Sequence, residues 1–391
     1  MMFRAAIEKM QPYVPGEQPR PGQRLIKLNT NENPYPPSPR IRRAIARAVA
    51  GDGLRLYPRP MADEFVAAAA KLYRVPSRMI VAGNGSDELL AMLFRAVLDP
   101  GDTVSYPVPT YPLYDTLAAI QEARVIRAEM DRDFGFPVEK LIDAAAKLTI
   151  ICSPNSPTGT EVSRRELIRL LDGLSPRLVA VDEAYADFAR RGLLGLVRSH
   201  RNLIVLRTLS KSFSLAGMRL GLCFAHESAI RQLLKVKDSY NLSRVAQAVG
   251  CAALEDARWA QRNAERIRRT RIEVTAQLRA MGFEVPPSAA NFVLARMAGI
   301  DLSTVAAGLR KRGILVRYFG TALLYDSLRI SIGLPAEMTI LIRELKDLAA
   351  PLALMSPGWR IVKEDSPRPR PPRPSQSARL NRKRPALAAP A

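Results

Sequence analysis

The segments LVAVD (residues 178–182) and LIVLRTLSK (residues 203–211) decide the fold, because each is a short apolar run that ends in a chemically active side chain. Apolar runs of about four to eight residues between polar ones are typical of strands buried on both faces. Similar runs occupy residues 79–81, 103–106 and 148–152, and helical patterns occupy residues 87–98, 111–120 and 163–174. Strands that alternate with helices at this spacing predict βαβ units and a largely parallel sheet.

The pattern changes towards the C-terminus. A long helical pattern over residues 245–281 leads to expected strands at 291–294, 314–316 and 328–331 and expected helices at 302–312 and 336–348. We therefore expect an α/β protein with a large domain and a smaller α+β domain. The expected divisions are an N-terminal segment contributing to the small domain (1–50), the large domain (51–280), the small domain (281–357) and a tail (358–391).

The charge is the one unusual feature of the composition. The 391 residues include 59 Lys and Arg against 37 Asp and Glu, a net charge of +22, whereas 47% hydrophobic residues is ordinary for a globular protein. The Pro- and Arg-rich residues 358–391 hold nine basic and two acidic residues, a net +7, and are expected to be disordered. Removing them leaves +15 (22 minus 7) on the body, spread over many helices.

Few side chains suit a metal site or a disulfide framework. The three cysteines lie far apart without CxxC spacing, and there are two histidines. No apolar run reaches the roughly 20 residues of a membrane span, and the first residues lack the apolar region of a secretory signal. We expect a cytoplasmic protein that binds no metal and no membrane.

Ligands of open parallel sheets bind beyond the carboxyl ends of the strands, where Lys211 and Asp182 are expected. Lys211 could form a Schiff base with an aldehyde cofactor, and Thr208, Ser210 and Arg219 are donors suited to a phosphate. Asp182 could face a protonated ring nitrogen, as pyridoxal phosphate requires. An acid-ended strand also fits a nucleotide-binding site, but the Gly-Lys pair of a phosphate-binding loop is absent from the sequence.

Four further positions each have a functional and a structural interpretation. Asn155, held between two prolines, could donate to a cofactor phenolate oxygen or simply form a turn. The turn GNGSDE (residues 83–88) could bind phosphate, or Ser86 could cap the next helix. Tyr111 could stack on a flat ring or belong to the core. Arg329, within a strand, needs a carboxylate from a ligand or from a structural salt bridge.

Together these motifs resemble the fold-type I aminotransferases that use pyridoxal 5′-phosphate, and within that group the histidinol-phosphate aminotransferases. Further matching segments are residues 12–17, 28–36 and 55–58, and the resemblance covers about residues 7–350. It implies a large domain with a mostly parallel seven-stranded sheet and a homodimer with shared active sites.

The resemblance also implies a role for each candidate residue. Lys211 would be the catalytic Schiff-base lysine, and Asp182 the partner of the ring nitrogen. The phosphate would be held by residues near two loops, and these are Gly85, Ser86, Thr208, Ser210 and Arg219. Asp87 would also belong to the cofactor-binding residues. The other cofactor contacts would come from Tyr111 over the ring, Asn155 and Tyr185 at the phenolate oxygen, and Tyr57 at the phosphate of the neighbouring subunit. The substrate would meet Tyr13, Asn155, Arg317 at its phosphate and Arg329 at its α-carboxylate.

The implied reaction converts histidinol phosphate and 2-oxoglutarate to imidazole acetol-phosphate and glutamate, in histidine biosynthesis. The sequence departs from the residues common in the family at Ser212, Ser214 and Met218. An aromatic aminotransferase or a threonine-phosphate decarboxylase-like paralogue is therefore an alternative function. A rival from another class is a basic tail that binds nucleic acid or acidic surfaces. Trp359 is the tail's one aromatic residue, so stacking on bases is weakly supported and nucleic-acid binding is not the favoured function.

Overall fold

The computed structural model describes residues 2–189 and 192–354, so the expected tail (358–391) lies outside the described residues. Its larger sheet has seven strands in the order β2-β8-β7-β6-β5-β3-β4. The bounds are β2 Ile80–Gly83, β3 Thr103–Val108, β4 Arg124–Glu129, β5 Leu148–Cys152, β6 Leu178–Asp182, β7 Leu203–Thr208 and β8 Gly221–Ala225. β8 runs antiparallel to both of its neighbours, and the other pairs are parallel, which confirms the expected mostly parallel seven-stranded sheet.

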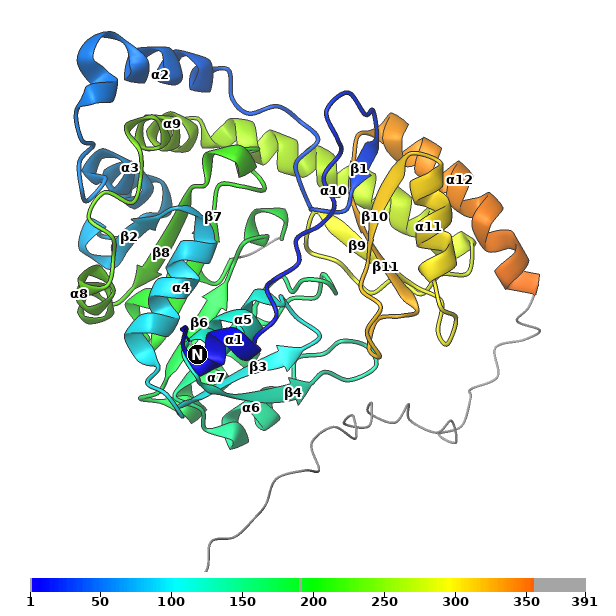
Figure 1. Cartoon of the computed structure of the whole chain (residues 1–391), viewed down its shortest axis with the longest axis horizontal. Helices are drawn as coiled ribbons and strands as arrows, with labels where there is room; N and C mark the ends of the chain where they lie inside the picture. Colours follow the sequence, from blue (N-terminus) through cyan, green and yellow to red (C-terminus); the bar gives the residue numbers. More distant parts are fainter. Residues whose placement is uncertain (1, 190–191, 355–391) are drawn as a thin grey trace, which may run out of the picture.

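Helices cover both faces of this sheet (Figure 1). The helices on this side of the molecule are α2 Arg40–Val49, α3 Asp63–Tyr73, α4 Gly85–Val97, α5 Leu113–Ile120, α6 Val138–Ala144, α7 Arg164–Leu174, α8 Glu227–Lys235 and α9 Arg244–Glu255, with α2 packed on α9. Alternate residues of β6 enter different apolar clusters, since Val179 and Val181 belong to one and Ala180 to another. Because both faces are buried, the strands read as continuous apolar runs in the sequence.

The smaller sheet has the strand order β1-β10-β11-β9. Its strands are β1 Ile26–Leu28, β9 Phe292–Arg296, β10 Ile314–Tyr318 and β11 Ser327–Ser331. The helices around it are α10 Ala257–Ala280, α11 Ser303–Lys311 and α12 Pro335–Leu354, and a separate short helix α1 spans Ala5–Lys9. β1 pairs with β10 in parallel, which brings the N-terminal region into this sheet. The domain boundaries stay a prediction.

The single helix expected over residues 245–281 is wrong, because α9 and α10 are separate helices that meet at Asp256. Asp256 has non-helical angles (φ −114°, ψ 38°), and its carboxylate accepts a hydrogen bond of 2.6 Å from Ser38 Oγ. α9 packs against α2 and α3, whereas α10 extends to the smaller sheet (Figure 1). Sequence periodicity continues across this bend because both helices bury apolar faces.

Short 3₁₀ helices complete the described elements: η1 Gly51–Arg55, η2 Ser77–Met79, η3 Ala186–Phe188, η4 Leu194–Arg198 and η5 Ala216–Met218.

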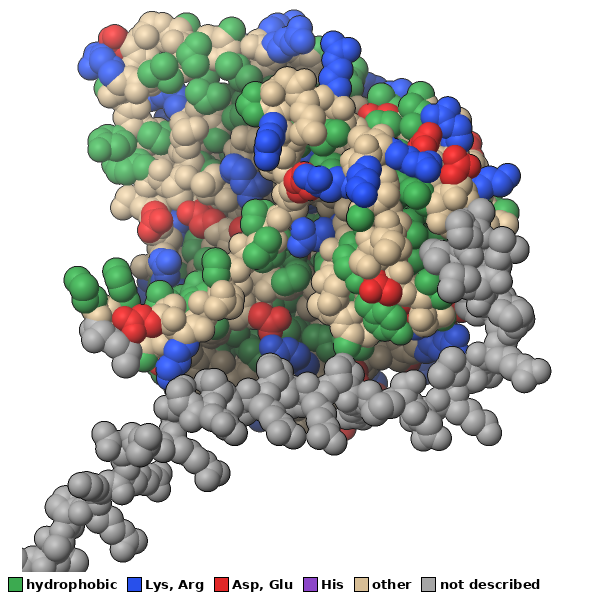
Figure 2. All heavy atoms as spheres, turned by 45° about the vertical axis from the view of Figure 1, so that its right-hand side comes forward, with side chains coloured by type: hydrophobic (Ala, Val, Ile, Leu, Met, Phe, Trp, Pro, Cys, Tyr) green, Lys and Arg blue, Asp and Glu red, His purple; other side chains and the backbone are tan. Residues whose placement is uncertain are grey.

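Lys and Arg side chains are spread among apolar and acidic ones over the face seen in Figure 2. Within residues 2–189 and 192–354, no helix combines the length and the apolar character needed to cross a membrane. The same residues contain no cluster of three or more His, Cys, Asp or Glu side chains able to hold a metal ion.

Candidate active site

A cleft of about 340 Å³ lies where the carboxyl ends of β5, β6 and β7 meet the smaller sheet. Most of the predicted site residues line it, although they come from segments far apart in the sequence. Those lining it are Tyr13, Ser86, Asp87, Tyr111, Asp182, Tyr185, Thr208, Ser210, Lys211, Arg219, Arg317 and Arg329. The open-sheet rule thus places the cleft correctly.

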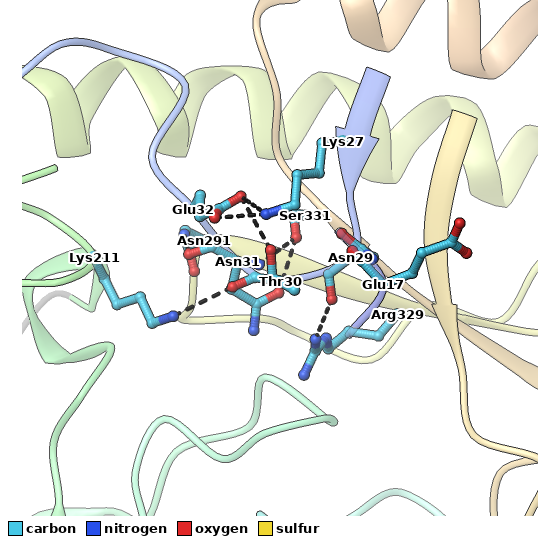
Figure 3. A network of polar contacts seen from close by, with 10 residues as sticks. All are labelled: Glu17, Lys27, Asn29, Thr30, Asn31, Glu32, Lys211, Asn291, Arg329 and Ser331. Carbon is cyan, nitrogen blue, oxygen red and sulfur yellow. Dashed lines mark hydrogen bonds and ion pairs between the residues drawn. The ribbon is translucent and has the colours of Figure 1, made fainter. Parts of the chain in front are cut away.

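Lys211 follows β7 and points across the cleft toward the segment after β1 (Figure 3). Its Nζ donates a hydrogen bond of 3.3 Å to the carbonyl of Thr30 and lies 5.7 Å from the centre of the Tyr185 ring. Burial lowers the pKa of Lys211 to about 8, and the positive charge of Arg329 lowers it further. A much larger fraction of this amine is therefore unprotonated at neutral pH than of an ordinary lysine, as a nucleophile or general base requires.

Asp182 is the last residue of β6 and is 3% exposed. Oδ2 accepts a hydrogen bond of 3.1 Å from the Tyr114 hydroxyl, and Oδ1 accepts one of 3.1 Å from the backbone N–H of Ala184. Burial raises the pKa of Asp182 to about 6, although the charge of Lys211 lowers it in part. No lysine or arginine in the described residues forms an ion pair with this carboxylate. A cationic group of a ligand would supply the missing partner.

Hydroxyl and guanidinium groups gather at the start of α4. Thr208 Oγ1 donates to Ser210 Oγ (2.9 Å), and Arg219 contacts both Ser210 Oγ (3.4 Å) and Asp87 Oδ2 (3.1 Å). Gly85 opens the helix with φ +82°, and a Cβ there would lie 2.5 Å from the Arg219 guanidinium. A helix N-terminus beside hydroxyls and an arginine suits a phosphate group.

Three further residues predicted to contact the cofactor, Tyr111, Tyr185 and Asn155, have different neighbours. The ring of Tyr111 packs edge-on against Tyr13 (6.0 Å between centroids) and Tyr114 (5.7 Å). The Tyr185 hydroxyl accepts a hydrogen bond of 3.0 Å from Asn31 Nδ2. Asn155 is fully buried beside the cleft, and its Nδ2 donates to the Pro109 carbonyl (3.0 Å) and to Thr158 Oγ1 (2.9 Å).

Tyr57 lies away from the cleft of its own chain. It is 77% exposed, and its ring stacks on Tyr240 with 4.4 Å between centroids. Its expected contact with the neighbouring subunit stays a prediction.

Arg329 and Arg317 bring two positive charges to the small-sheet side of the cleft. Arg329 donates to Ser156 Oγ (3.0 Å) and to the Asn29 carbonyl (2.7 Å), and its buried Nε has no partner. Arg317 donates to the Val14 carbonyl (3.3 Å). Neither forms an ion pair within the part of the chain that the structure describes, so the structural salt bridge considered for Arg329 is absent there. Burial lowers the pKa of Arg329.

Residues 29–31 also line the cleft, although the sequence analysis assigned them no role. Their three successive carbonyls accept hydrogen bonds from Arg329, from Lys211 Nζ and from Asn291 Nδ2 (Figure 3). Asn31 has φ +57°, a left-handed conformation that asparagine tolerates better than most residues. The sequence signal was the Asn-rich segment itself, which contributed to the resemblance without an assigned role.

The sequence model of the family "Aminotransferase class I and II" matches residues 23–345. The chain belongs to this family of aminotransferases. It is 42% identical over 346 residues to histidinol-phosphate aminotransferase 1 of Trichormus variabilis, a match covering 88% of this chain and 98% of the relative. It is 44% identical over 349 residues to the histidinol-phosphate aminotransferase of Citrifermentans bemidjiense, with the same coverage. Within the class, the chain therefore belongs to the histidinol-phosphate aminotransferases.

A solved structure supports the same assignment. The histidinol-phosphate aminotransferase of Sinorhizobium meliloti, in complex with pyridoxal-5′-phosphate, is similar with a TM-score of 0.82 and 27% identity, over 90% of this chain and 98% of that one. The predicted resemblance and fold are confirmed.

Proposed function

We propose that the protein transfers the amino group of histidinol phosphate to 2-oxoglutarate in histidine biosynthesis. The observation that carries the proposal is Arg329, a partly buried arginine that lines the cleft of Lys211 without a carboxylate partner among the described residues. A guanidinium in such a place is costly unless it meets an anion. Histidinol phosphate, which has no carboxylate, would supply its phosphate, and glutamate would supply its α-carboxylate.

Pyridoxal 5′-phosphate is the cofactor of this class of enzyme, and the cleft fits it in three respects. Asp182 is a buried carboxylate in need of a cation, which the protonated ring nitrogen provides. Lys211 is an amine with a lowered pKa, suited to the aldehyde carbon. Thr208, Ser210 and Arg219 surround a helix N-terminus, suited to the phosphate. When bound, the cofactor supplies an electron sink for the charge left at the substrate Cα.

The chain's own residues divide the remaining work. Lys211 Nζ accepts the proton from the substrate Cα, which its lowered pKa permits near neutral pH. Asp182 stabilises a positive charge at the ring nitrogen. Arg329 fixes the α-carboxylate of glutamate so that its Cα–H bond is oriented for cleavage. Tyr13, at the mouth of the cleft, helps to exclude water.

Arg317 favours a phosphorylated substrate over an aromatic one. Its guanidinium lines the cleft without an ion pair in the described residues and lies 5.4 Å from the centre of the Phe319 ring. A phosphate, or the second carboxylate of glutamate, neutralises this charge, whereas a phenyl ring leaves it unpaired. The test is ketone formation from histidinol phosphate with 2-oxoglutarate by purified protein loaded with cofactor. Absence of product there, with turnover of phenylalanine, would favour the aromatic alternative.

The homodimer with shared active sites and the cytoplasmic location are further parts of this proposal. Exposed apolar side chains on residues 49–61 and at Tyr240 support an interface beside Tyr57. They are Val49, Leu54, Leu56, Met61 and Tyr240, and the Lys237 ammonium links the two segments through the Pro60 carbonyl. A sedimenting mass of about twice the 43.2 kDa of the chain would agree with a dimer.

A further inference from the structure

Tyr114 lies one residue inside α5, and helical periodicity turns it into the core. Tyr114, Leu117 and Ala118 form the buried face of this short helix, and Tyr114 is fully buried. Its ring packs against Tyr106 on β3 (5.6 Å between centroids) and edge-on against Tyr111 (5.7 Å, 84° between planes). Packing on both sides therefore fixes the direction of its hydroxyl group.

That hydroxyl group reaches Asp182, which stands 68 residues further along the chain, at 3.1 Å from Oδ2. Burial raises the pKa of Tyr114 well above its usual value near 10, so the hydroxyl keeps its proton and acts as the donor. The Ala184 N–H holds the other carboxylate oxygen. One donor on each oxygen fixes the plane of the carboxylate at the base of the cleft, which Asp182 lines.

We propose that Tyr114 is a positioning residue, which holds Asp182 in the orientation that meets the ring nitrogen of the cofactor while its ring supports Tyr111. The inference rests on the proposed role of Asp182. One turn of chain, Tyr111 to Tyr114, thus places the side chain over the cofactor ring and the donor that orients the carboxylate at its nitrogen. A hydrogen bond to a buried carboxylate contributes more than one between neutral groups.

Other titratable groups around Asp182 do not replace this contact. The charge of Asp87 on α4 raises the pKa of Asp182, and that of Lys211 lowers it. The charge of Asp182 in turn raises the pKa values of Cys152, Tyr111 and Tyr185. Among the described residues, Tyr114 is the one whose side chain donates a hydrogen bond to this carboxylate.

The test compares cofactor binding by the cofactor-free forms of the wild type and Tyr114→Phe. Two ligands are used: pyridoxal 5′-phosphate and its 1-deaza analogue, in which carbon replaces the ring nitrogen. We expect Tyr114→Phe to weaken binding of pyridoxal phosphate by about tenfold and that of the analogue by less than about twofold. A residue that merely supports the fold would weaken both ligands equally, and that result would overturn the inference.

Tyr106→Phe is the matched control, because Tyr106 is equally buried in the same cluster but donates to Asp115 (2.6 Å) instead. It should leave the ratio of the two affinities unchanged. Thermal unfolding of each cofactor-free variant checks that the proteins compared are folded. If Tyr114→Phe does not fold, Tyr114→His is used instead, because histidine retains a hydrogen-bond donor. This variant should still bind pyridoxal phosphate more tightly than the 1-deaza analogue, and loss of that preference would overturn the inference.

The failure of this inference differs from failure of the proposed function. A wild type that binds both ligands equally would refute the proposed role of Asp182. If the wild type binds pyridoxal phosphate more tightly than the 1-deaza analogue, and Tyr114→Phe shows the same ratio of affinities as the wild type, only the role of Tyr114 is refuted.

Discussion

Arg317 and Arg329 stand directly opposite each other on the antiparallel strands β10 and β11, with both guanidinium groups lining the cleft. Like charges in opposed positions of a sheet repel each other. Burial lowers the pKa of Arg329, and the charge of Arg317 adds to that effect. This unfavourable pair would be relieved by an anion in the cleft, such as the phosphate of histidinol phosphate or the carboxylates of glutamate.

Arg329→Met should separate function from stability. We expect kcat/KM for glutamate to fall by about 100-fold, since the buried pairing with its α-carboxylate is lost. The free energy of unfolding of the cofactor-free protein should stay equal or rise, because an unpaired charge is removed from a partly buried position. Urea unfolding and steady-state kinetics measure the two quantities.

Arg296→Met, on the neighbouring strand β9, is the control for that variant. Arg296 pairs with the buried Asp326 at 2.9 Å, so its loss should cost about 3 kcal/mol of unfolding free energy and little activity. Equal destabilisation by both substitutions would make Arg329 a structural residue.

Arg317→Ala should act selectively on the phosphorylated substrate. We expect kcat/KM for histidinol phosphate to fall by about 100-fold and that for phenylalanine to change by less than about threefold. Arg310→Ala, which removes the exposed pair with Glu17, should change neither by more than about twofold. A parallel loss for both substrates would contradict a phosphate contact at Arg317.

The cofactor-free protein should lose stability as pH rises through the range of Asp182. The pKa of this carboxyl in the folded chain is about 6, above its ordinary 3.8, so its contribution is fully present below about pH 4 and lost as pH passes 6. The loss is about 3 kcal/mol, from 1.36 kcal/mol per pKa unit.

Asp182→Asn should remove this dependence. The difference in unfolding free energy between wild type and variant is followed by urea titration from pH 4 to 8. A difference that stays constant with pH would show that Asp182 does not titrate in this range.

Lys211 should react with pyridoxal phosphate as an amine of lowered pKa. In the cofactor-free protein the rate of cofactor attachment should rise with pH and level off above about pH 8, since the unprotonated amine is the nucleophile. Stopped-flow absorbance measures this rate, and Lys211→Ala should give no such signal. Levelling above pH 10, as for an exposed lysine, would show that the cleft does not shift this pKa.

Mixed dimers test whether subunits share active sites. Lys211→Ala and Tyr57→Ala, each inactive or weak alone, should recover about a quarter of wild-type activity when unfolded together and refolded. Half of the dimers are then hybrids, and each hybrid has one intact site. Recovery no greater than the sum of the separate variants would refute the sharing.

The sequence alone predicted candidate catalytic residues where they lie at or just beyond the end of a strand. Asp182 and Lys211 were identified because buried parallel strands leave uninterrupted apolar runs, and such strands end at one edge of the sheet. The same local signal predicted β5 at Leu148–Cys152 with its observed bounds. It failed at Asp256, where a bend between two helices interrupts no apolar pattern.

Other functional contacts depend on tertiary structure. Tyr114 reads in the sequence as one more apolar residue of a helix, and its hydrogen bond to Asp182 spans 68 positions. The Thr30 carbonyl that holds Lys211 Nζ lies 181 positions away, and a backbone carbonyl has no sequence signature at all. Nor does the spacing of Arg317 and Arg329 reveal that they face each other across two strands.

The sequence by itself thus determined the α/β class and the mostly parallel sheet, and it predicted Lys211 and Asp182 at the strand ends, because local apolar periodicity encodes the strands. The tertiary structure decided which groups shift the pKa values of those two residues and which arginines lack a carboxylate partner within the described chain. The physical reason is that burial and charge act through distances in space, which folding sets and sequence separation does not.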